Sequence, residues 1–232
     1  MARLRAPHLV LSCAALTALV AGCSLSDFGP TKEAKRTYTV DGKITALSAT
    51  THGGDIEVVP VAAGGSVKVT EKYRYNDHKP TPAHSVKDGR LTLKAEDCGM
   101  GRKCEVDFRV LLPRDASVSL HTSGGDVTVR GTSGAIDAET SGGDVTIADS
   151  TARRAQARTS GGDVDLTLTT MPDDISARTS GGNVTVRLPK GSYAVKATTS
   201  GGTSKVSVPT DPHSPHKVTA HTSGGDVSVQ NS

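Results

Sequence analysis

A hexapeptide, Thr-Ser-Gly-Gly-Asp-Val, recurs along the second half of this chain at nearly regular intervals. A looser copy begins at Thr51, where His52 replaces the serine, and the six later copies, some slightly altered, begin at Thr122, Thr140, Thr159, Thr179, Thr199 and Thr222. The first glycines of these six copies are separated by 18, 19, 20, 20 and 23 residues. Self-similarity at a period near twenty is typical of solenoids, in which each repeat forms a coil that stacks on its neighbours.

Residues on both sides of each Gly-Gly pair alternate between apolar and polar, as in β-strands with one buried face. Before the glycines, the first apolar column is Val118, Ile136, Ala155, Ile175, Val195 and Val218, and the second is Leu120, Ala138, Ala157, Ala177, Ala197 and Ala220. After them come the pairs Val127 and Val129, Val145 and Ile147, Val164 and Leu166, Val184 and Val186, Val206 and Val208, and Val227 and Val229. The pattern predicts coils of two strands with β-branched residues inside, around a thin core suited to a chain with two Phe and no Trp.

We therefore expect an all-β chain, a single-stranded right-handed parallel β-solenoid that resembles a β-helix. Paired glycines at its corners allow positive φ and close approach of neighbouring coils. The corner residues are Gly53, Gly54, Gly124, Gly125, Gly142, Gly143, Gly161, Gly162, Gly181, Gly182, Gly201, Gly202, Gly224 and Gly225. Antiparallel hairpins around Gly-Gly turns are an alternative, although identical residues at the same place in every copy favour parallel coils.

The N-terminus indicates export. Arg3 and Arg5 precede an uncharged apolar run from Leu9 to Val20, and small residues then lead directly to Cys23. This order indicates a bacterial lipoprotein signal peptide over residues 1–22, with Cys23 as the residue that takes the lipid. We expect the mature protein to be anchored to the outer face of the cell membrane by this cysteine.

Ordinary signal cleavage near Ala21, with the next cysteine left free, is the alternative. Residues 23–36 are polar and are expected to form a flexible tether. Removal of residues 1–22 takes two of the 27 basic residues and none of the 24 acidic ones, so 25 basic residues remain and the net charge is +1. Without clustered Lys and Arg, nothing indicates a nucleic-acid partner.

Beyond the regular array, residues 37–117 are expected to form a degenerate first coil and a β cap with a hairpin, and residues 118–232 the regular coils. A solenoid end exposes unpaired strand edges, which atypical terminal units cover. Four strands are predicted between Pro60 and Pro113: Ser66 to Thr70 continuing to Tyr75, Ser85 to Val86, Arg90 to Ala95, and Glu105 to Leu112.

Cys98 and Cys104 remain after Cys13 leaves with the signal and Cys23 takes the lipid. Two leftover cysteines in an exported chain are expected to pair as a disulfide. Their loop would join two strand-like runs as a stapled hairpin tip. A redox or metal site is the alternative, but it lacks the usual Cys-x-x-Cys spacing and nearby ligands.

The residue after each Gly-Gly pair forms an acidic column, Asp55, Asp126, Asp144, Asp163 and Asp226, with Asn183 and Thr203 in two copies. Four of these, Asp126, Asp144, Asp163 and Asp226, are weak candidates for a ladder that binds cations such as calcium. The alternative is that their side chains cap local backbone N–H groups at the turn. We favour capping and expect no metal and no cofactor.

Outward positions differ more between copies than the motif does. Before the turn they are His121, Glu139, Arg158, Arg178, Thr198 and His221, whose mixed charges indicate a solvated surface. After it they are Thr128, Thr146, Asp165, Thr185, Ser207 and Ser228, a hydroxyl-rich column. Tyr73 and Tyr75 share one strand face and could stack on a sugar or pack against the cap.

Catalytic motifs of the common hydrolases, metalloproteases and nucleotide-binding enzymes do not occur in this sequence. The serine of each hexapeptide is not a nucleophile candidate, because one active serine would not be repeated six times. We expect no catalytic residue and no enzymatic activity. A polysaccharide-acting β-helix enzyme is the alternative, and it would need a unique acid or base cluster on one face.

The Ser-Gly-Gly-Asp-Val repeat behind a lipoprotein signal resembles a bacterial domain-of-unknown-function family labelled putative adhesin, from about Thr37 to Ser232. The resemblance implies a cell-envelope β-solenoid without a known catalytic site, in some members linked to envelope stress responses. The expected role is a lipid-anchored, non-enzymatic protein that presents a surface to a wall polymer, an envelope protein or a membrane-active peptide. A purely structural envelope role is a further alternative.

Overall fold

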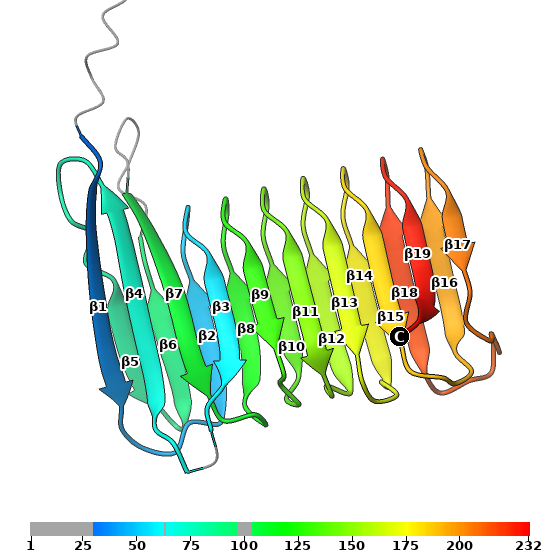
Figure 1. The fold of residues 1–232 in the computed structure, drawn as a ribbon, viewed down its shortest axis with the longest axis horizontal. Helices are drawn as coiled ribbons and strands as arrows, with labels where there is room; N and C mark the ends of the chain where they lie inside the picture. Colours follow the sequence, from blue (N-terminus) through cyan, green and yellow to red (C-terminus); the bar gives the residue numbers. More distant parts are fainter. Residues whose placement is uncertain (1–29, 63, 97–103) are drawn as a thin grey trace, which may run out of the picture.

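The computed structural model describes residues 30–62, 64–96 and 104–232, which fold into two facing β-sheets of a flattened solenoid (Figure 1). From the N-terminal end, sheet A comprises β1 (Lys32–Val40), β4 (Val67–Tyr75), β7 (Cys104–Leu112), β3 (Ile56–Pro60), β9 (Val127–Arg130), β11 (Val145–Ser150), β13 (Val164–Leu168), β15 (Val184–Leu188), β19 (Val227–Asn231) and β17 (Ser204–Val206). Sheet B comprises β5 (Ala83–Lys87), β6 (Arg90–Lys94), β2 (Ala46–Thr50), β8 (Ser117–His121), β10 (Ile136–Glu139), β12 (Arg154–Arg158), β14 (Asp174–Arg178), β18 (Lys217–Thr222) and β16 (Ala194–Thr199). The part of the chain that the structure describes has no helix long and apolar enough to cross a membrane.

Each regular coil runs through one strand of sheet B and then one strand of sheet A, and neighbouring coils are parallel. Ile136 pairs with Val118 on one side and Ala155 on the other, and Val145 lies between Val127 and Val164 in the same way. Identical positions therefore stack as predicted, with Val, Ile, Leu and Ala in the buried core. The all-β parallel solenoid is confirmed, and the antiparallel alternative for the regular coils is wrong.

The end coils do not follow chain order. At the N-terminal end, the β2–β3 coil lies between β6–β7 and β8–β9, and at the other end β18–β19 lies between β14–β15 and β16–β17 (Figure 1). Both outermost coils are degenerate copies. The β6–β7 coil has no Gly-Gly pair, and the β16–β17 coil has Thr203-Ser204 where the others have Asp-Val or a close variant. The copies that deviate most from the motif are thus placed where one side of the coil has no regular neighbour.

One predicted alignment is wrong. Ser204 pairs with Val227 and Val206 pairs with Val229, so Val206 stands two residues away from its predicted equivalent. The side chain of Val206 is 39% exposed, because β17 forms the end of sheet A. Val208, the predicted partner of Val229, is buried but lies beyond the end of β17.

Antiparallel strands close the N-terminal end. The four predicted cap strands are present as β4, β5, β6 and β7, and β1 adds a further strand that pairs with β4 from Lys32 to Val40. The segment expected to be a tether over residues 23–36 therefore overlaps β1 from Lys32 onward. The predicted signal peptide, Cys23 and the tether as far as residue 29 lie outside the described residues.

The expected hairpin between the two cysteine-flanking strands is wrong. β6 pairs with β2 and β5 in sheet B, whereas β7 pairs with β3 and β4 in sheet A. The two strands therefore belong to different sheets and do not pair with each other. Cys98 lies outside the described residues, so its pairing with Cys104 stays a prediction.

A buried carboxylate lies inside the cap. Glu71 on β4 is fully buried and accepts hydrogen bonds from the hydroxyls of Tyr38, at 2.9 Å, and Tyr73. Tyr73 is itself only 2% exposed, so it packs within the cap and does not offer a surface for sugar stacking. Burial, followed by the hydrogen bond to Glu71, raises the pKa of both tyrosines well above the ordinary value.

This network predicts loss of stability at alkaline pH. Tyrosines of the unfolded chain titrate near pH 10, whereas Tyr38 and Tyr73 hold their protons to higher pH in the folded state. The folded state then binds more protons, so their contribution is fully present below about pH 10 and is lost as the pH rises further. Between pH 8 and 11, we expect the free energy of unfolding, measured with denaturant, to decline less steeply in Tyr38→Phe than in wild type. The difference in slope should be up to about 1.4 kcal/mol per pH unit. An equally steep decline in that variant would contradict the assignment.

Candidate functional site: the glycine corner and the outer face of sheet B

The second glycine of each corner packs directly on the backbone of the neighbouring coil. A Cβ atom added to Gly143 would lie 2.1 Å from the carbonyl oxygen of Gly125, whereas one on Gly142 would meet nothing closer than the Ser123 oxygen at 3.6 Å. The predicted close approach is therefore confirmed for the second glycine. The predicted positive φ is wrong, because the glycines with positive φ among the described residues are Gly42, Gly64, Gly89 and Gly131.

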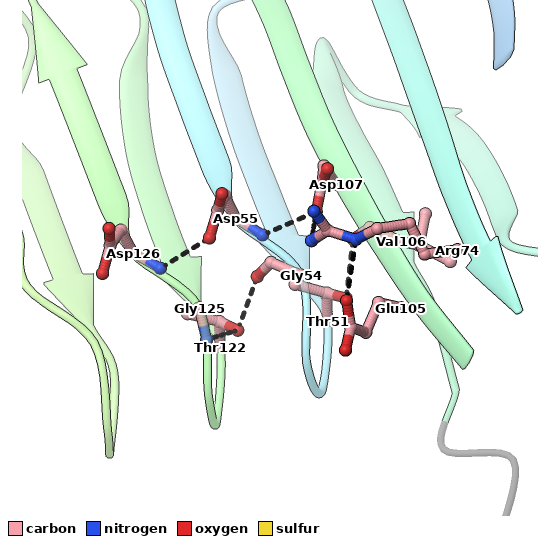
Figure 2. Close-up of polar contacts among 10 residues, drawn as sticks. All are labelled: Thr51, Gly54, Asp55, Arg74, Glu105, Val106, Asp107, Thr122, Gly125 and Asp126. Atoms are coloured by element: carbon pink, nitrogen blue, oxygen red, sulfur yellow. Dashed lines mark hydrogen bonds and ion pairs between the residues drawn. The ribbon is translucent and has the colours of Figure 1, made fainter. Parts of the chain in front are cut away.

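The motif threonine ties each corner to the next (Figure 2). The hydroxyl of Thr122 donates to the carbonyl oxygen of Gly54 at 2.9 Å and accepts from the N–H of Gly125 at 3.4 Å. The same donation to the adjoining coil recurs at 2.7–2.9 Å from Thr51, Thr140, Thr159, Thr179, Thr199 and Thr222. Thr51 donates to the oxygen of Val106, which shows that the β6–β7 coil occupies a normal place in the stack without a glycine pair.

Replacement of one motif threonine by its isostere tests this link. Thr140→Val removes the buried donor to Gly125 and the acceptor for the half-buried Gly143 N–H. We expect the free energy of unfolding to fall by about 1–3 kcal/mol, measured by denaturant unfolding, because the freed backbone groups cannot reach water. Thr146→Val, on the outer face of β11, is the matched control and should change it little; equal losses would refute a specific role for the motif hydroxyl.

The aspartate column forms a hydrogen-bonded ladder between coils. Oδ1 of Asp55 accepts from the N–H of Asp126 at 2.9 Å, and the N–H of Asp55 donates to Oδ1 of Asp107 at 3.1 Å (Figure 2). The ladder continues at 2.6–2.9 Å through Asp144, Asp163, Asn183, Asp226 and Thr203. Each aspartate or asparagine side chain of the ladder thus caps the backbone of the adjoining coil, where the sequence predicted capping within its own turn.

The two residues that replace aspartate in this column are explained by the same hydrogen bonds between coils. Asn183 keeps an Oδ1 that accepts from the N–H of Asp226 at 2.9 Å, although it carries no charge. Thr203 lies on the outermost coil, beyond which no further coil of the described residues presents an N–H. The column requires an acceptor rather than a charge, which supports capping over cation binding. No group of three His, Cys, Asp or Glu side chains in the described ranges could hold a metal ion.

Asp144 distinguishes the two interpretations. Asp144→Asn keeps the acceptor for the Asp163 N–H and should change the free energy of unfolding by less than about 0.5 kcal/mol. Asp144→Ala removes it and should cost about 1 kcal/mol. Thermal unfolding with and without millimolar calcium completes the test. A melting temperature that rises with calcium, and that Asp144→Asn no longer shows, would establish a cation ladder instead.

Asp107 is the ladder member that the sequence did not reveal, because Val106 stands where the others have glycine. Arg74 on β4 donates to Glu105 at 2.8 Å and to Asp107 at 3.1 Å, which places a cation at the N-terminal end of the ladder (Figure 2). Burial raises the pKa of Asp107, while the Asp55 N–H and the Arg74 charge oppose that shift. The motif spacing gives no signal for this contact, which depends on the antiparallel pairing of β4 with β7.

The outer face of sheet B carries the column that varies most. In spatial order its residues are Lys94, Thr50, His121, Glu139, Arg158, Arg178, His221 and Thr198. His121 lies 3.8 Å from Glu139, but neither Arg158 nor Arg178 forms an ion pair with a described residue. The exchange of the last two coils brings His221 beside Arg178, where chain order would have placed Thr198.

The outer column of sheet A is less charged. Thr128, Thr146, Asp165, Thr185 and Ser228 align as predicted, and Asp165 is paired with Arg187. The prediction that Ser207 is the sixth member of this column is wrong, because the register places Lys205 beside Ser228. The uncompensated charges of the two regular faces therefore lie mainly on sheet B.

Comparison with known proteins finds a family model that matches most of this chain. The family model described as Toastrack DUF4097 matches residues 37–230, which include most of the cap and all the coils. No curated protein matches the sequence. A solved structure of a putative cell adhesion protein from Clostridium sporogenes is similar over 87% of this chain and 100% of its own, with 14% identity and a TM-score of 0.48. A putative adhesin from Bacteroides fragilis is similar over 87% and 97%, with 18% identity and a TM-score of 0.44.

Proposed function

Because the chain belongs to the Toastrack DUF4097 family, we propose that it is a non-enzymatic binding protein of the bacterial cell envelope. In this proposal a lipid on Cys23 holds it at the outer face of the membrane, and the solenoid presents its outer face to an envelope ligand. Its role in the cell is adhesion to envelope material or the sensing of stress at the envelope. No nucleic acid is involved.

The observation that supports this proposal is that repeated and variable residues have different roles. The threonine, second glycine and aspartate of each repeat are engaged in contacts between coils. The motif aspartates are exposed as well, but they hardly vary, whereas the outward side chains of the strands differ from coil to coil. A repeated scaffold with a variable, partly uncompensated charged face is suited to recognition.

The anchor and the binding role can be tested on the full chain. Wild type expressed in a bacterial host should incorporate labelled palmitate and fractionate with membranes, and Cys23→Ser should do neither. Purified wild type should then bind isolated cell-wall or membrane fractions saturably in sedimentation assays. A protein that releases reducing sugars or cleaves esters in those fractions would contradict the non-enzymatic role, and one that binds none of them would favour a purely structural role.

A further inference from the structure

Three cationic or ionisable side chains form a single file on the outer face of sheet B. Arg158 is paired in register with Arg178, and Arg178 with His221, on the parallel strands β12, β14 and β18. Parallel strands are about 4.8 Å apart, so the file extends roughly 10 Å along the solenoid axis. We call these three residues the cationic file.

Charge stacking of this kind costs stability unless an anion relieves it. Like charges at directly opposed positions of a sheet repel each other. Neither arginine of the file forms an ion pair with a described residue, and the acidic neighbour in register with Arg158 is Glu139 on β10. Two columns away on the same strands, Arg154, Asp174 and Lys217 alternate in sign, so no two like charges lie side by side there. The uncompensated file is therefore a local feature and does not reflect a generally basic face.

The surroundings of the file suit a polar ligand. Between the file and the column of alternating charge lie Gln156, Ser176 and Thr219, which are neutral and can form hydrogen bonds. Gln156 and Ser176 also line a shallow depression of about 150 Å³ beside the file, together with Asp137, Arg154 and Asp174. No side chain of the file lines this depression, so it lies outside the proposed site. At the C-terminal end of the file, Thr198 contacts Nδ1 of His221 at 2.9 Å.

We propose that the cationic file binds one linear polymer that carries phosphate or carboxylate groups, which lies along the solenoid axis. This inference rests on the proposed envelope-binding function and names its ligand class. Each guanidinium presents a planar set of donors that matches the oxygens of a phosphate or carboxylate. Successive anions of one extended chain would contact Arg158, Arg178 and His221 in turn, and Glu139 at the next position would repel the chain and so mark the end of the site.

A linear ligand fits better than an anionic membrane surface. A flat bilayer against sheet B would also meet Asp137, Glu139 and Asp174, which are exposed on the same face. A chain that follows the file avoids Asp174, which is four residues along β14 from Arg178, or roughly 13 Å at the usual rise of a strand. The charge pattern therefore matches a single row of anions.

The test measures binding of the full chain, in a zwitterionic detergent, to inorganic polyphosphate and to polygalacturonate. Wild type should bind at least one of them, with log K falling linearly as log salt concentration rises. The double variant Arg158→Gln with Arg178→Gln should bind at least tenfold more weakly. The slope of log K against log salt concentration should become shallower by about 1.5, because binding through two fewer contacts releases fewer counterions. Arg130→Gln, an exposed arginine on sheet A, is the matched control and should stay within about twofold of wild type.

Other outcomes overturn the inference. Equal binding by wild type and the double variant would remove the cationic file from the site. Equally tight, arginine-dependent binding to vesicles of an anionic phospholipid would show that the file docks to a membrane. Binding of orthophosphate as tightly as polyphosphate would show that the ligand need not be a linear polymer. If the chain binds polyphosphate through both arginines but binds no envelope fraction, the proposed function is wrong and the proposed site is supported. If it binds an envelope fraction and the two arginines are not needed for this, the proposed site is wrong and the proposed function is supported.

Discussion

Gly143→Ala is expected to lower the free energy of unfolding by about 3 kcal/mol or more, while Gly142→Ala, one residue earlier, changes it by less than about 1 kcal/mol. The new Cβ of Gly143→Ala would lie 2.1 Å from the carbonyl oxygen of Gly125, so two backbones must separate. At Gly142 the nearest atom is 3.6 Å away and φ is not positive, so alanine is accommodated there. In addition, the coil separation would stretch the 2.8 Å hydrogen bond from the hydroxyl of Thr140 to the carbonyl oxygen of Gly125.

Denaturant unfolding of the two variants and of wild type tests this prediction. Both substitutions add the same methyl group to the same motif, so differences in intrinsic propensity and in the unfolded state largely cancel between them. Similar losses at both positions would show that backbone flexibility, and not close contact of the coils, is what the glycines provide. The difference between the two variants therefore measures the packing of the corner itself.

The repeat predicts the regular part of this fold because its constraints are local and recur. Alternation sets which residues of β10 and β12 face inward, and a constant spacing places Ile136 beside Ala155 without any knowledge of distant contacts. The glycine corner follows from the same regularity. Of its two predicted causes, only the close approach of backbones is observed. The sequence could not separate it from positive φ, because both requirements select glycine.

The ends of the solenoid could not be predicted in the same way. Every regular coil offers the same backbone surface, so the spacing of the motifs cannot say whether β16–β17 or β18–β19 stacks on β14–β15. The pairing of Arg178 with His221, on which the proposed site depends, follows from that exchange. Asp107 was missed for a related reason, since its place in the ladder is set by stacking on Asp55 and its own segment lacks the motif. A signal does exist in the degenerate copies, because Ser204 replaces the core valine only where a coil ends the stack.

Deletion of residues 217–232 is expected to unfold the β16–β17 coil, although that coil remains in the chain. In the described structure β16 pairs only with β18, and β17 only with β19, so the deletion removes every strand partner of both. Stacking on β14–β15 instead would place Ser204 against Val184, where Val227 now packs. We expect hydrogen exchange of the amides in residues 194–206 to become as fast as in an unstructured peptide, while β8 to β13 stay protected.

A second variant separates loss of a partner from an inability to stack. In the truncated chain, Thr203→Asp together with Ser204→Val restores the motif of an inner coil, and we expect it to recover protection over residues 194–206. In the full chain the same pair of substitutions should change stability little, because this coil has no outer neighbour there. Retained protection in the truncated chain without these substitutions would mean that any coil can stack on any other. Coil order would then be set by the connecting loops, and the degenerate motif would be a consequence of the end position and not its cause.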